Sequence, residues 1–351
     1  MSKLRIGIIG LGGIANSVHI PGIQKSNGGE IIAVCDNNEA TLRRVGDRIG
    51  IPDDHRFTDY RALIACPDVD AVEICTPNYL HVAMAAEAVR AGKPIHVEKP
   101  LSISLEKTKE LTDALAANPV PNMMCFSYRY KSAVRYAKWI LEEGLLGDVV
   151  SINVEYLKDS AFMPGRRLEW RFVKEYAGTG VLGDLGVHLI DMARFLIGDF
   201  KEVSADCGIV VKERKKLDSE EIGQVETDDY CNFIAKLEGG VAATFSITRC
   251  AIGQRNTIKY DIYGTKGVIS FDLNHPEVLG VCVGEVDLKS KSVHTVQVPP
   301  EFTASQEQMF VDVASGKPGK YVPTIADGIA CQKILDALLL SSEEKRVIVI
   351  D

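Results

Sequence analysis

The fold is decided by one stretch near the start of the chain, LRIGIIGLGGIA at residues 4–15. Its first half, Leu4–Ile9, is an apolar run that predicts a buried β-strand. Its second half has the pattern G-x-G-x-x-A. In such a turn the first glycine permits the tight bend, the second lets a pyrophosphate approach the backbone, and the small third residue packs helix against strand. The stretch therefore predicts a dinucleotide-binding turn at a helix N-terminus, formed by Gly10, Gly12, Gly13 and Ile14.

The first third of the chain continues this alternation of strands and helices. Further apolar runs, rich in Ile and Val, predict strands at 31–35, 71–74, 94–97 and 120–125. Helical patterns lie at 13–25, 39–49, 79–91 and 104–117. Strands that are apolar on both faces and alternate with helices are typical of a parallel sheet covered on both sides. We therefore expect an α/β, doubly wound Rossmann domain at residues 1–125.

Beyond residue 125 the pattern changes to strands joined by short turns. Strands are predicted at 149–156, 203–211, 230–237, 240–248, 258–264, 267–272, 293–298 and 346–350, and helices at 131–142, 182–197 and 325–340. The turns Glu238–Gly240 and Gly264–Gly267 favour hairpins, and strands joined in this way are antiparallel. Residues 126–351 are therefore expected to form an α+β domain with an open, largely antiparallel sheet.

Composition excludes several classes of protein. A length of 351 residues suggests two domains, and a formal net charge of -8 argues against a general nucleic-acid binder. No apolar run reaches the roughly 18 residues of a membrane helix, so we expect a cytoplasmic protein. The nine cysteines include no C-x-x-C pair and are expected to be reduced. We expect no metal site.

Asp36 bears on the choice of cofactor. It ends the second predicted strand, about 20 residues beyond the glycines, where a carboxylate binds the ribose hydroxyls of NAD. The next residues are Asn37 and Asn38, whereas an arginine would suit the 2′-phosphate of NADP. The pattern favours NAD and makes NADP less suitable, and the alternative is that Asp36 is only a turn residue.

Several polar side chains lie at strand ends. Ligands of open α/β sheets bind beyond the carboxyl ends of the strands. Lys99 is the most informative, because a lysine at the end of a buried strand is costly unless it is used, and Pro100 restricts its conformation. We hypothesise a cis peptide between these two residues, and the alternative is an ordinary exposed lysine. The strand ends expected to meet at one crevice carry Asp36, Thr76, Asn78, Glu98 and Lys99.

A second polar group lies on the helix at 182–197. Asp184, His188 and Asp191 have the spacing i, i+4 and i+7, which places them along one helical face. Histidine is the natural proton acceptor near neutral pH, and a carboxylate one turn away can stabilise the imidazolium. Two alternatives remain open: an ordinary ion-paired histidine, or a metal site formed by the same three side chains.

Three segments carry a resemblance to a known family. They are CTPNYLH at residues 75–81, EKP at 98–100 and GVLGDLGVHLID at 180–191. Together, and in this order, they resemble the Gfo/Idh/MocA oxidoreductases, over nearly the whole chain. The resemblance implies a Rossmann domain followed by an α+β domain whose sheet packs subunits into a homodimer or homotetramer.

The resemblance also implies roles for individual residues. Lys99 would meet the substrate hydroxyl beside the nicotinamide, and desolvation would lower its pKa. His188 would be the base and Asp184 its partner and a substrate ligand. Glu98 would contact the nicotinamide ribose. His81 would shape the cofactor side of the pocket or serve only as a first-turn helix residue.

Two further segments are secondary candidates. The family often has Asn-Arg or Arg-Arg where this chain has Tyr128-Arg129, so substrate contacts at Ser127 and Tyr128 are less certain, while Arg129 is expected to contact the cofactor or a carboxylate. Trp170 and Arg171 lie where related enzymes place aromatic residues on a sugar, although Trp170 is almost as well explained as a core or lid residue.

The sequence therefore predicts an NAD-dependent oxidoreductase that oxidises a secondary hydroxyl of a sugar or cyclic polyol to a ketone. One alternative is a glycoside-cleaving enzyme that uses transient oxidation. Another is a non-catalytic NAD-linked sensor, which would have no need of Lys99, Asp184 and His188 together. The sequence does not identify the sugar, the hydroxyl or the direction.

Overall fold

The computed structural model describes residues 3–350, which form two compact units. The first contains residues up to Phe126 together with 304–330, and the second contains 127–303 and 331 onward. The sequence predicted a single boundary after residue 125. Segment 304–330 returns to the first unit because α10 (Gln306–Ala314) packs on α1 (Ile20–Lys25) and on β6 (Asn122–Met124).

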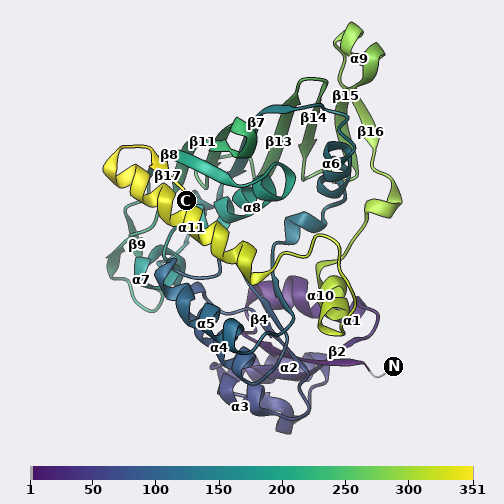
Figure 1. Ribbon diagram of the computed structural model, residues 1–351. Coiled ribbons are helices and arrows are strands. Elements are labelled where there is room, and N and C mark those ends of the chain that lie inside the picture. Colours follow the sequence, from purple (N-terminus) through teal and green to yellow (C-terminus); the bar gives the residue numbers. More distant parts are fainter. Residues whose placement is uncertain (1–2, 351) are drawn as a thin grey trace. The chain divides into compact units, whose positions relative to one another are not determined.

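The first unit is built on a six-stranded parallel sheet with the strand order β3-β2-β1-β4-β5-β6 (Figure 1). The remaining strands are β1 (Leu4–Ile9), β2 (Gly29–Cys35), β3 (Arg56–Phe57), β4 (Ala71–Ile74) and β5 (Ile95–Val97). The order reverses between β1 and β4, the switch point at which such sheets bind ligands. The predicted doubly wound Rossmann domain is confirmed.

Helices pack on this sheet because each connection between parallel strands must cross over it. The longer helices are α2 (Glu39–Ile49), α4 (His81–Arg90) and α5 (Lys109–Ala117), and α3 (Tyr60–Ala65) is short. Helices α3, α4 and α5 contact one another in sequence. Short helical turns are η1 (Ala15–His19), η2 (Asp53–His55), η3 (Asn78–Leu80) and η4 (Glu106–Thr108).

The second unit is built on a nine-stranded sheet with the order β16-β15-β14-β13-β7-β12-β11-β8-β17. Its strands are β7 (Val149–Lys158), β8 (Phe200–Gly208), β11 (Tyr230–Leu237), β12 (Ala242–Thr248), β13 (Asn256–Gly264), β14 (Gly267–Asp272), β15 (Val278–Val283), β16 (His294–Gln297) and β17 (Ile348–Val349). Within residues 3–350, neighbouring strands of this sheet pair antiparallel, except that β7 and β12 are parallel. The largely antiparallel sheet is thus confirmed. A separate two-stranded ribbon joins β9 (Glu213–Lys215) to β10 (Ile222–Gln224).

Helices α6 (Ser132–Glu142) and α8 (Val187–Leu196) lie against one another beside this sheet (Figure 1). Alternate residues of β11, such as Cys231, Phe233 and Ala235, are buried, and those between them are exposed, so only one face of the strand packs on the core. The remaining elements are α7 (Lys174–Ala177), α9 (Gly284–Ser290), α11 (Ile325–Glu344) and the turns η5 (Ser127–Tyr130), η6 (Ser160–Phe162), η7 (Trp170–Phe172), η8 (Leu182–Gly186), η9 (Glu238–Gly240) and η10 (Pro300–Phe302).

Within residues 3–350, none of the helices is both long enough and apolar enough to cross a membrane.

Candidate active site

The glycine turn after β1 has the shape that a pyrophosphate needs. Gly10 has a φ of +89°, and a Cβ there would lie 2.8 Å from the carbonyl oxygen of Cys75. At Gly12 and Gly13 a Cβ would meet nothing within 4 Å, so the backbone is open on that side. The helical turn that follows starts with N–H groups that have no partner within the helix. The turn fits a dinucleotide, and the phosphates would be held by Gly12, Gly13 and Ile14.

Asp36 lies directly beside this turn. One carboxylate oxygen accepts a hydrogen bond from the Leu11 N–H at 2.8 Å, and the other accepts one from the Asn38 N–H at 2.9 Å. Each carboxylate oxygen has a second lone pair, so Asp36 can hold the turn and still accept ribose hydroxyls. Both interpretations offered by the sequence, turn residue and ribose ligand, are therefore compatible in the same side chain.

His81 lies between the loop after β4 and the loop after β5. This residue has no exposed surface, and its ring nitrogens lie 2.7 Å from the carbonyl oxygen of Thr76 and 2.8 Å from that of Pro100. Burial lowers the pKa of His81, while the two carbonyl groups act in the opposite direction. A neutral imidazole has one N–H, so His81 can donate to only one of these two carbonyl oxygens at a time. Its predicted role at the cofactor side of the pocket remains a prediction, and the nearby Asn78 is also buried.

Lys99 lies at the end of β5, next to Glu98. The Lys99–Pro100 peptide is cis, as hypothesised from the sequence. The Lys99 N–H donates to one oxygen of the Glu98 carboxylate at 3.1 Å, and the other oxygen lies 2.9 Å from Nε2 of His19. The backbone of Lys99 is thus held by a carboxylate that is itself held by a buried histidine.

His19 belongs to a buried polar cluster that sequence reasoning missed. The cluster also contains Glu73 on β4, His96 on β5 and Cys125, and one donor atom from each lies within 4.8 Å of the others. Nδ1 of His19 is 3.0 Å from Glu73, and Nδ1 of His96 is 2.8 Å from the same carboxylate. The register that pairs Glu73 with His96 could have been read from the two predicted strands, since both are polar residues in apolar runs.

The members of the cluster shift one another's pKa values. Burial alone would raise the pKa of Glu73, but the neighbouring His96 and His19 lower it to about 2. Burial alone would lower the pKa of His19, yet its pKa lies well above the usual value because Cys75 and Glu73 face the ring. Glu307 on α10 is a further carboxylate, 3.6 Å from His19. The returning segment 304–330 therefore contributes to this cluster.

In the second unit, the loop before α8 is fixed by Asp228. Its buried carboxylate accepts hydrogen bonds from the Gly180 N–H at 2.6 Å and the Leu182 N–H at 2.8 Å. A Cβ on Gly180 would lie 1.9 Å from the Asp228 carbonyl oxygen, so only glycine fits there. Asp184 follows in the first turn, where its own N–H donates to the Gly180 carbonyl at 3.0 Å.

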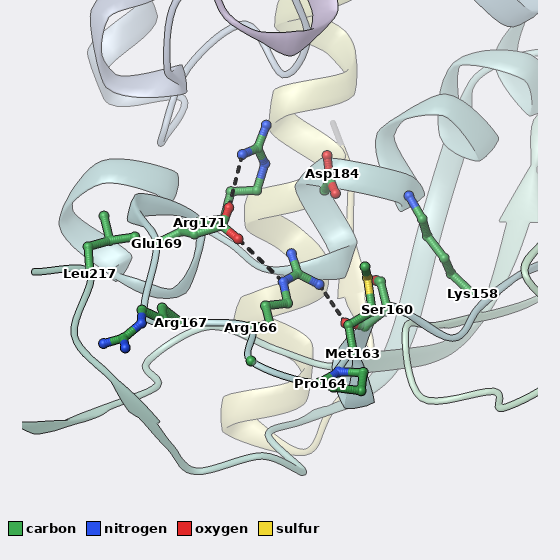
Figure 2. Close-up of a pocket in the computed structure, with 11 residues that line it drawn as sticks. Lys158, Ser160, Met163, Pro164, Arg166, Arg167, Glu169, Arg171, Asp184 and Leu217 are labelled. Carbon is green, nitrogen blue, oxygen red and sulfur yellow. Dashed lines mark hydrogen bonds and ion pairs between the residues drawn. The ribbon is translucent and has the colours of Figure 1, made fainter. Parts of the chain in front are cut away.

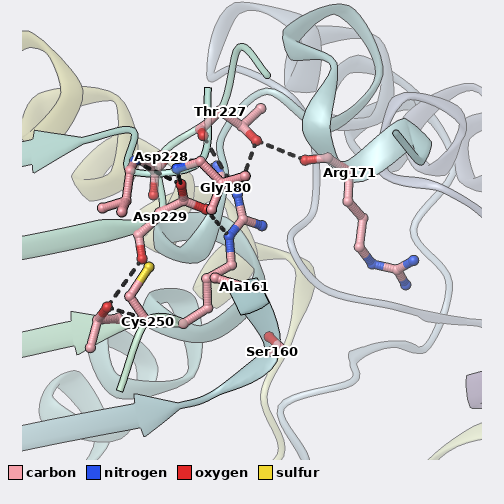
Figure 3. Close-up of polar contacts among 12 residues, drawn as sticks. Ser160, Ala161, Arg171, Gly180, Thr227, Asp228, Asp229 and Cys250 are labelled. Atoms are coloured by element: carbon pink, nitrogen blue, oxygen red, sulfur yellow. Dashed lines mark hydrogen bonds and ion pairs between the residues drawn. The ribbon is translucent and has the colours of Figure 1, made fainter. Parts of the chain in front are cut away.

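Figure 3 shows that Asp228 is part of a larger network formed by Thr227, Asp228 and Asp229. The Thr227 hydroxyl donates to the carbonyl oxygen of Arg171 at 2.9 Å. The Asp229 carboxylate pairs with Nε of Arg249 at 2.5 Å and accepts two backbone N–H groups, those of Val210 and Val211. Three successive side chains therefore bond to three separate segments: Thr227 to the loop at Arg171, Asp228 to the start of the helix, and Asp229 to Arg249 directly after β12.

His188 lies one turn after Asp184 and is buried. Its ring is 4.4 Å from that of Tyr128, measured between centroids. The Tyr128 hydroxyl is 3.0 Å from the hydroxyl of Tyr156, which donates to Asn256 at 3.1 Å. Burial raises the pKa of Tyr156, as do Tyr128 and the charge of Asp184. Tyr128, where the chain departs from the pattern of the family, thus lies against the predicted base.

Asp191, the third residue of the predicted polar stripe, pairs with Arg129. The guanidinium Nε and Nη2 lie 2.8 and 2.5 Å from the two carboxylate oxygens, and both side chains are buried. Among residues 3–350, the groups of His, Cys, Asp and Glu donors close enough to share an ion do not include Asp184, His188 or Asp191. The metal-site alternative at these residues therefore has no support in the geometry.

Asp184 lines a cavity of about 690 Å³ within the second unit. Figure 2 shows Asp184, Lys158 and Arg166 directed toward the same space. The volume is in the range of small-molecule pockets. Arg171 lines the cavity, and its guanidinium carbon lies 4.4 Å from the centroid of the Trp170 ring. The predicted contacts of these two residues with a substrate remain predictions. The other lining residues are Ser160, Met163, Pro164, Gly165, Arg167, Glu169 and Leu217.

Comparison with known proteins identifies the family. The model described as the oxidoreductase family, NAD-binding Rossmann fold, matches residues 4–126, and the GFO/IDH/MocA C-terminal domain matches residues 134–270. A levoglucosan dehydrogenase of Pseudarthrobacter phenanthrenivorans is 32% identical over 320 residues, which cover 82% of each chain. This chain belongs to the GFO/IDH/MocA oxidoreductase family. It is therefore an NAD-binding dehydrogenase, and the prediction of NAD as cofactor is confirmed.

Other members of the family are similar over nearly their whole length. The glucose-6-phosphate 3-dehydrogenase of Bacillus subtilis is 28% identical over 341 residues, covering 95% of this chain and 94% of that protein. An inositol 2-dehydrogenase of Rhizobium meliloti is 25% identical and covers 98% of both chains. A solved levoglucosan dehydrogenase in complex with NADH has a TM-score of 0.90 and 29% identity, and the match covers all of both chains.

Sequence reasoning missed Tyr156, Lys158 and Arg166 of the second unit. Tyr156 and Lys158 lie at the end of β7, and Arg166 lies in the loop after it. A weak signal was available for Tyr156, which is the last residue of a predicted strand in which it occupies a buried position. The loop that carries Arg166 has no regular pattern, so its side chains could not be placed from the sequence.

Proposed function

We propose that this GFO/IDH/MocA oxidoreductase oxidises a secondary hydroxyl of a sugar or cyclic polyol to a ketone. The observation that carries the proposal is the polar cavity bordered by Asp184, with His188 one helical turn away. The named relatives support the substrate class, since they are dehydrogenases of levoglucosan, glucose 6-phosphate and inositol.

Bound NAD⁺ supplies the hydride acceptor for such a reaction. The residues proposed to hold it are the glycine turn with Ile14, Asp36 at the ribose, and Thr76, Asn78 and Glu98 at the strand ends. Arg129, which pairs with Asp191, is retained only as a predicted cofactor contact.

Three residues are proposed to act on the substrate hydroxyl. His188 accepts its proton, Lys99 stabilises the developing alkoxide, and Asp184 accepts a hydrogen bond from an adjacent hydroxyl. Tyr128 packs against the imidazole, which limits the orientations that the base can adopt. Ser127, Trp170 and Arg171 remain predicted substrate contacts.

The test is a panel of sugars and inositols with NAD⁺ and with NADP⁺, followed by reduced-cofactor absorbance. We expect turnover with NAD⁺. Lys99→Ala and His188→Ala should each lower kcat by at least about 100-fold, in the range of general acid–base catalysis, while the Kd for NADH changes less than about threefold. Lys107→Gln, at an exposed position on η4, is the control. Near-normal turnover in both variants would refute the assigned roles, and substrate cleavage without NADH would indicate the transient-oxidation reaction instead.

A homodimer or homotetramer formed through the sheet of the second unit remains a prediction. The exposed residues of β11 and β13 include the apolar Ile234 and Tyr263. Light scattering of the wild type and of Ile234→Lys tests this: we expect a smaller assembly in the variant, and a monomeric wild type would contradict the prediction.

A further inference from the structure

The cavity beside Asp184 has an excess of positive charge. It is lined by four cationic side chains, Lys158, Arg166, Arg167 and Arg171, and by two carboxylates, Glu169 and Asp184. The chain as a whole has a formal net charge of -8, so this concentration of cations runs against its composition.

The partners of these cations differ. Arg167 is fully engaged by the Glu220 carboxylate at 2.8 Å and by the carbonyl oxygens of Lys216 and Ser219. Arg166 and Arg171 share one carboxylate, Glu169, and each is 3.5 Å from it. Among residues 3–350, no partner lies within bonding distance of the Lys158 amino group. The charges of Lys158, Arg166 and Arg171 are therefore only partly compensated.

The wall behind the cavity adds further cations. The guanidinium groups of Arg166, Arg214 and Arg249 all lie within 4.8 Å of the Phe172 ring centroid. Asp229 neutralises Arg249, whereas the guanidinium of Arg214 donates to two uncharged groups, the carbonyl oxygens of Ala161 and Arg166. Burial lowers the pKa of Arg166, and Arg249 and Arg171 lower it further against the pull of Glu169 and Asp184. Such a group of cations is costly to bury unless a negative charge joins it.

We propose that the cavity binds an acidic group of the substrate, so that the substrate is a sugar or polyol that carries a carboxylate or a phosphate ester. The proposal rests on the proposed function, because Asp184 borders the same cavity. Arg166 and Arg171 present planar guanidinium groups, which bind either anion through paired hydrogen bonds, and Lys158 adds a point charge. The Asp184 carboxylate can accept a hydrogen bond from a neutral hydroxyl of the same substrate molecule. Because it is negatively charged, it disfavours an anionic group at the side of the cavity where it lies.

The test compares D-glucose with D-glucuronate and D-glucose 6-phosphate, and myo-inositol with its phosphate monoester. We expect kcat/KM to be at least about 100-fold higher for an acidic sugar than for its neutral counterpart, and to fall with ionic strength. Arg166→Gln should lower kcat/KM for the acidic sugar about 100-fold, mainly through KM, and change that for the neutral sugar less than threefold. The carboxylate and phosphate arms identify which anion the cavity takes.

Calorimetric binding to the NADH-saturated protein separates this inference from the proposed function. If no sugar is oxidised, the proposed function fails. Tighter binding of an acidic sugar than of its neutral counterpart would still support the acidic-group site, provided that the preference is lost in Arg166→Gln and retained in the Lys107→Gln control. Equal binding of acidic and neutral sugars, or an equal loss of both in Arg166→Gln, overturns it even if neutral sugars are oxidised. Far-ultraviolet circular dichroism and the Tm of each variant check that it is folded.

Discussion

Replacing Asp228 with alanine should loosen the start of the helix that carries Asp184 and His188. The carboxylate accepts hydrogen bonds from two backbone N–H groups, at 2.6 and 2.8 Å, and the whole side chain is buried. Each buried donor left without a partner costs about 1–3 kcal/mol. Burial of the Asp228 carboxylate has a desolvation cost, which raises the pKa of Asp228 in the folded protein. Replacing Asp228 with alanine also removes this cost. We therefore expect a net loss of about 2–4 kcal/mol, below the sum of two full penalties.

The assay is thermal unfolding of Asp228→Ala, of Asp228→Asn and of the control Asp218→Ala, whose side chain is exposed in the ribbon between β9 and β10. At about 2–4 °C per kcal/mol for a unit of this size, the alanine variant should melt roughly 4–16 °C lower. Asparagine should be intermediate, because its amide oxygen can accept one of the two N–H groups while its NH₂ group faces the other.

Turnover provides the second measurement on the same variants. The Kd for NADH should be unchanged in Asp228→Asn, because the glycine turn belongs to the first unit, while kcat falls as the helix start loses its fixed position. A Tm for Asp228→Ala within 1 °C of that of the control would refute the reasoning, because it would mean that the two N–H groups find other partners at no cost.

Two further predictions concern the first unit. Because the folded pKa of Glu73, about 2, lies below its usual 4.5, its contribution to stability is complete above about pH 4.5 and is lost as the pH falls toward 2. Glu73→Gln should flatten the acid limb of Tm against pH, whereas Glu343→Gln, at an exposed position on α11, should leave it unchanged. Parallel acid limbs in wild type and Glu73→Gln would count against the cluster. Gly12→Val should keep the Tm within about 2 °C but raise the Kd for NADH at least tenfold, about 1.4 kcal/mol, because its side chain would enter open space where a phosphate must lie. Gly10→Val should instead lower the Tm, since its φ is +89° and its Cβ would press on Cys75; unchanged NADH binding by Gly12→Val would contradict the assignment of the turn.

Much of the first unit could be predicted because its signals are local. The strands β1 and β4 have the predicted bounds, and α2 covers the predicted residues 39–49. The missed strand β3 has two residues, Arg56 and Phe57, which is too short for any periodicity. The return of segment 304–330 was missed for a different reason. Glu307 meets His19 across nearly the whole length of the chain, and no local pattern records such a contact.

The second unit was predicted less completely. The strands β11 and β14 have the predicted bounds because buried and exposed residues alternate along them, and tight turns flank them. β15 was missed because its run VLGVCV contains a glycine and lacks clear alternation. The spacing of Asp184, His188 and Asp191 predicted one polar helical face, but it gave no indication that Asp191 would pair with Arg129. Whether a polar side chain on this helix faces solvent, a substrate or an internal partner depends on side chains that are far away in the sequence, as Arg129 is from Asp191.

The buried cluster is connected to the main chain of Lys99 through Glu98. Its N–H donates to Glu98, Glu98 faces His19, His19 faces Glu73, and Glu73 is bonded to His96. These groups come from η1, β4 and the end of β5, so the backbone at Lys99 is fixed by three elements of the sheet and its covering helix. Buried charges that compensate one another are strongly destabilising when only one member is removed. The same arrangement that makes the cluster costly to alter therefore contributes to positioning the main chain at Lys99, and a residue proposed to stabilise a developing charge requires such positioning.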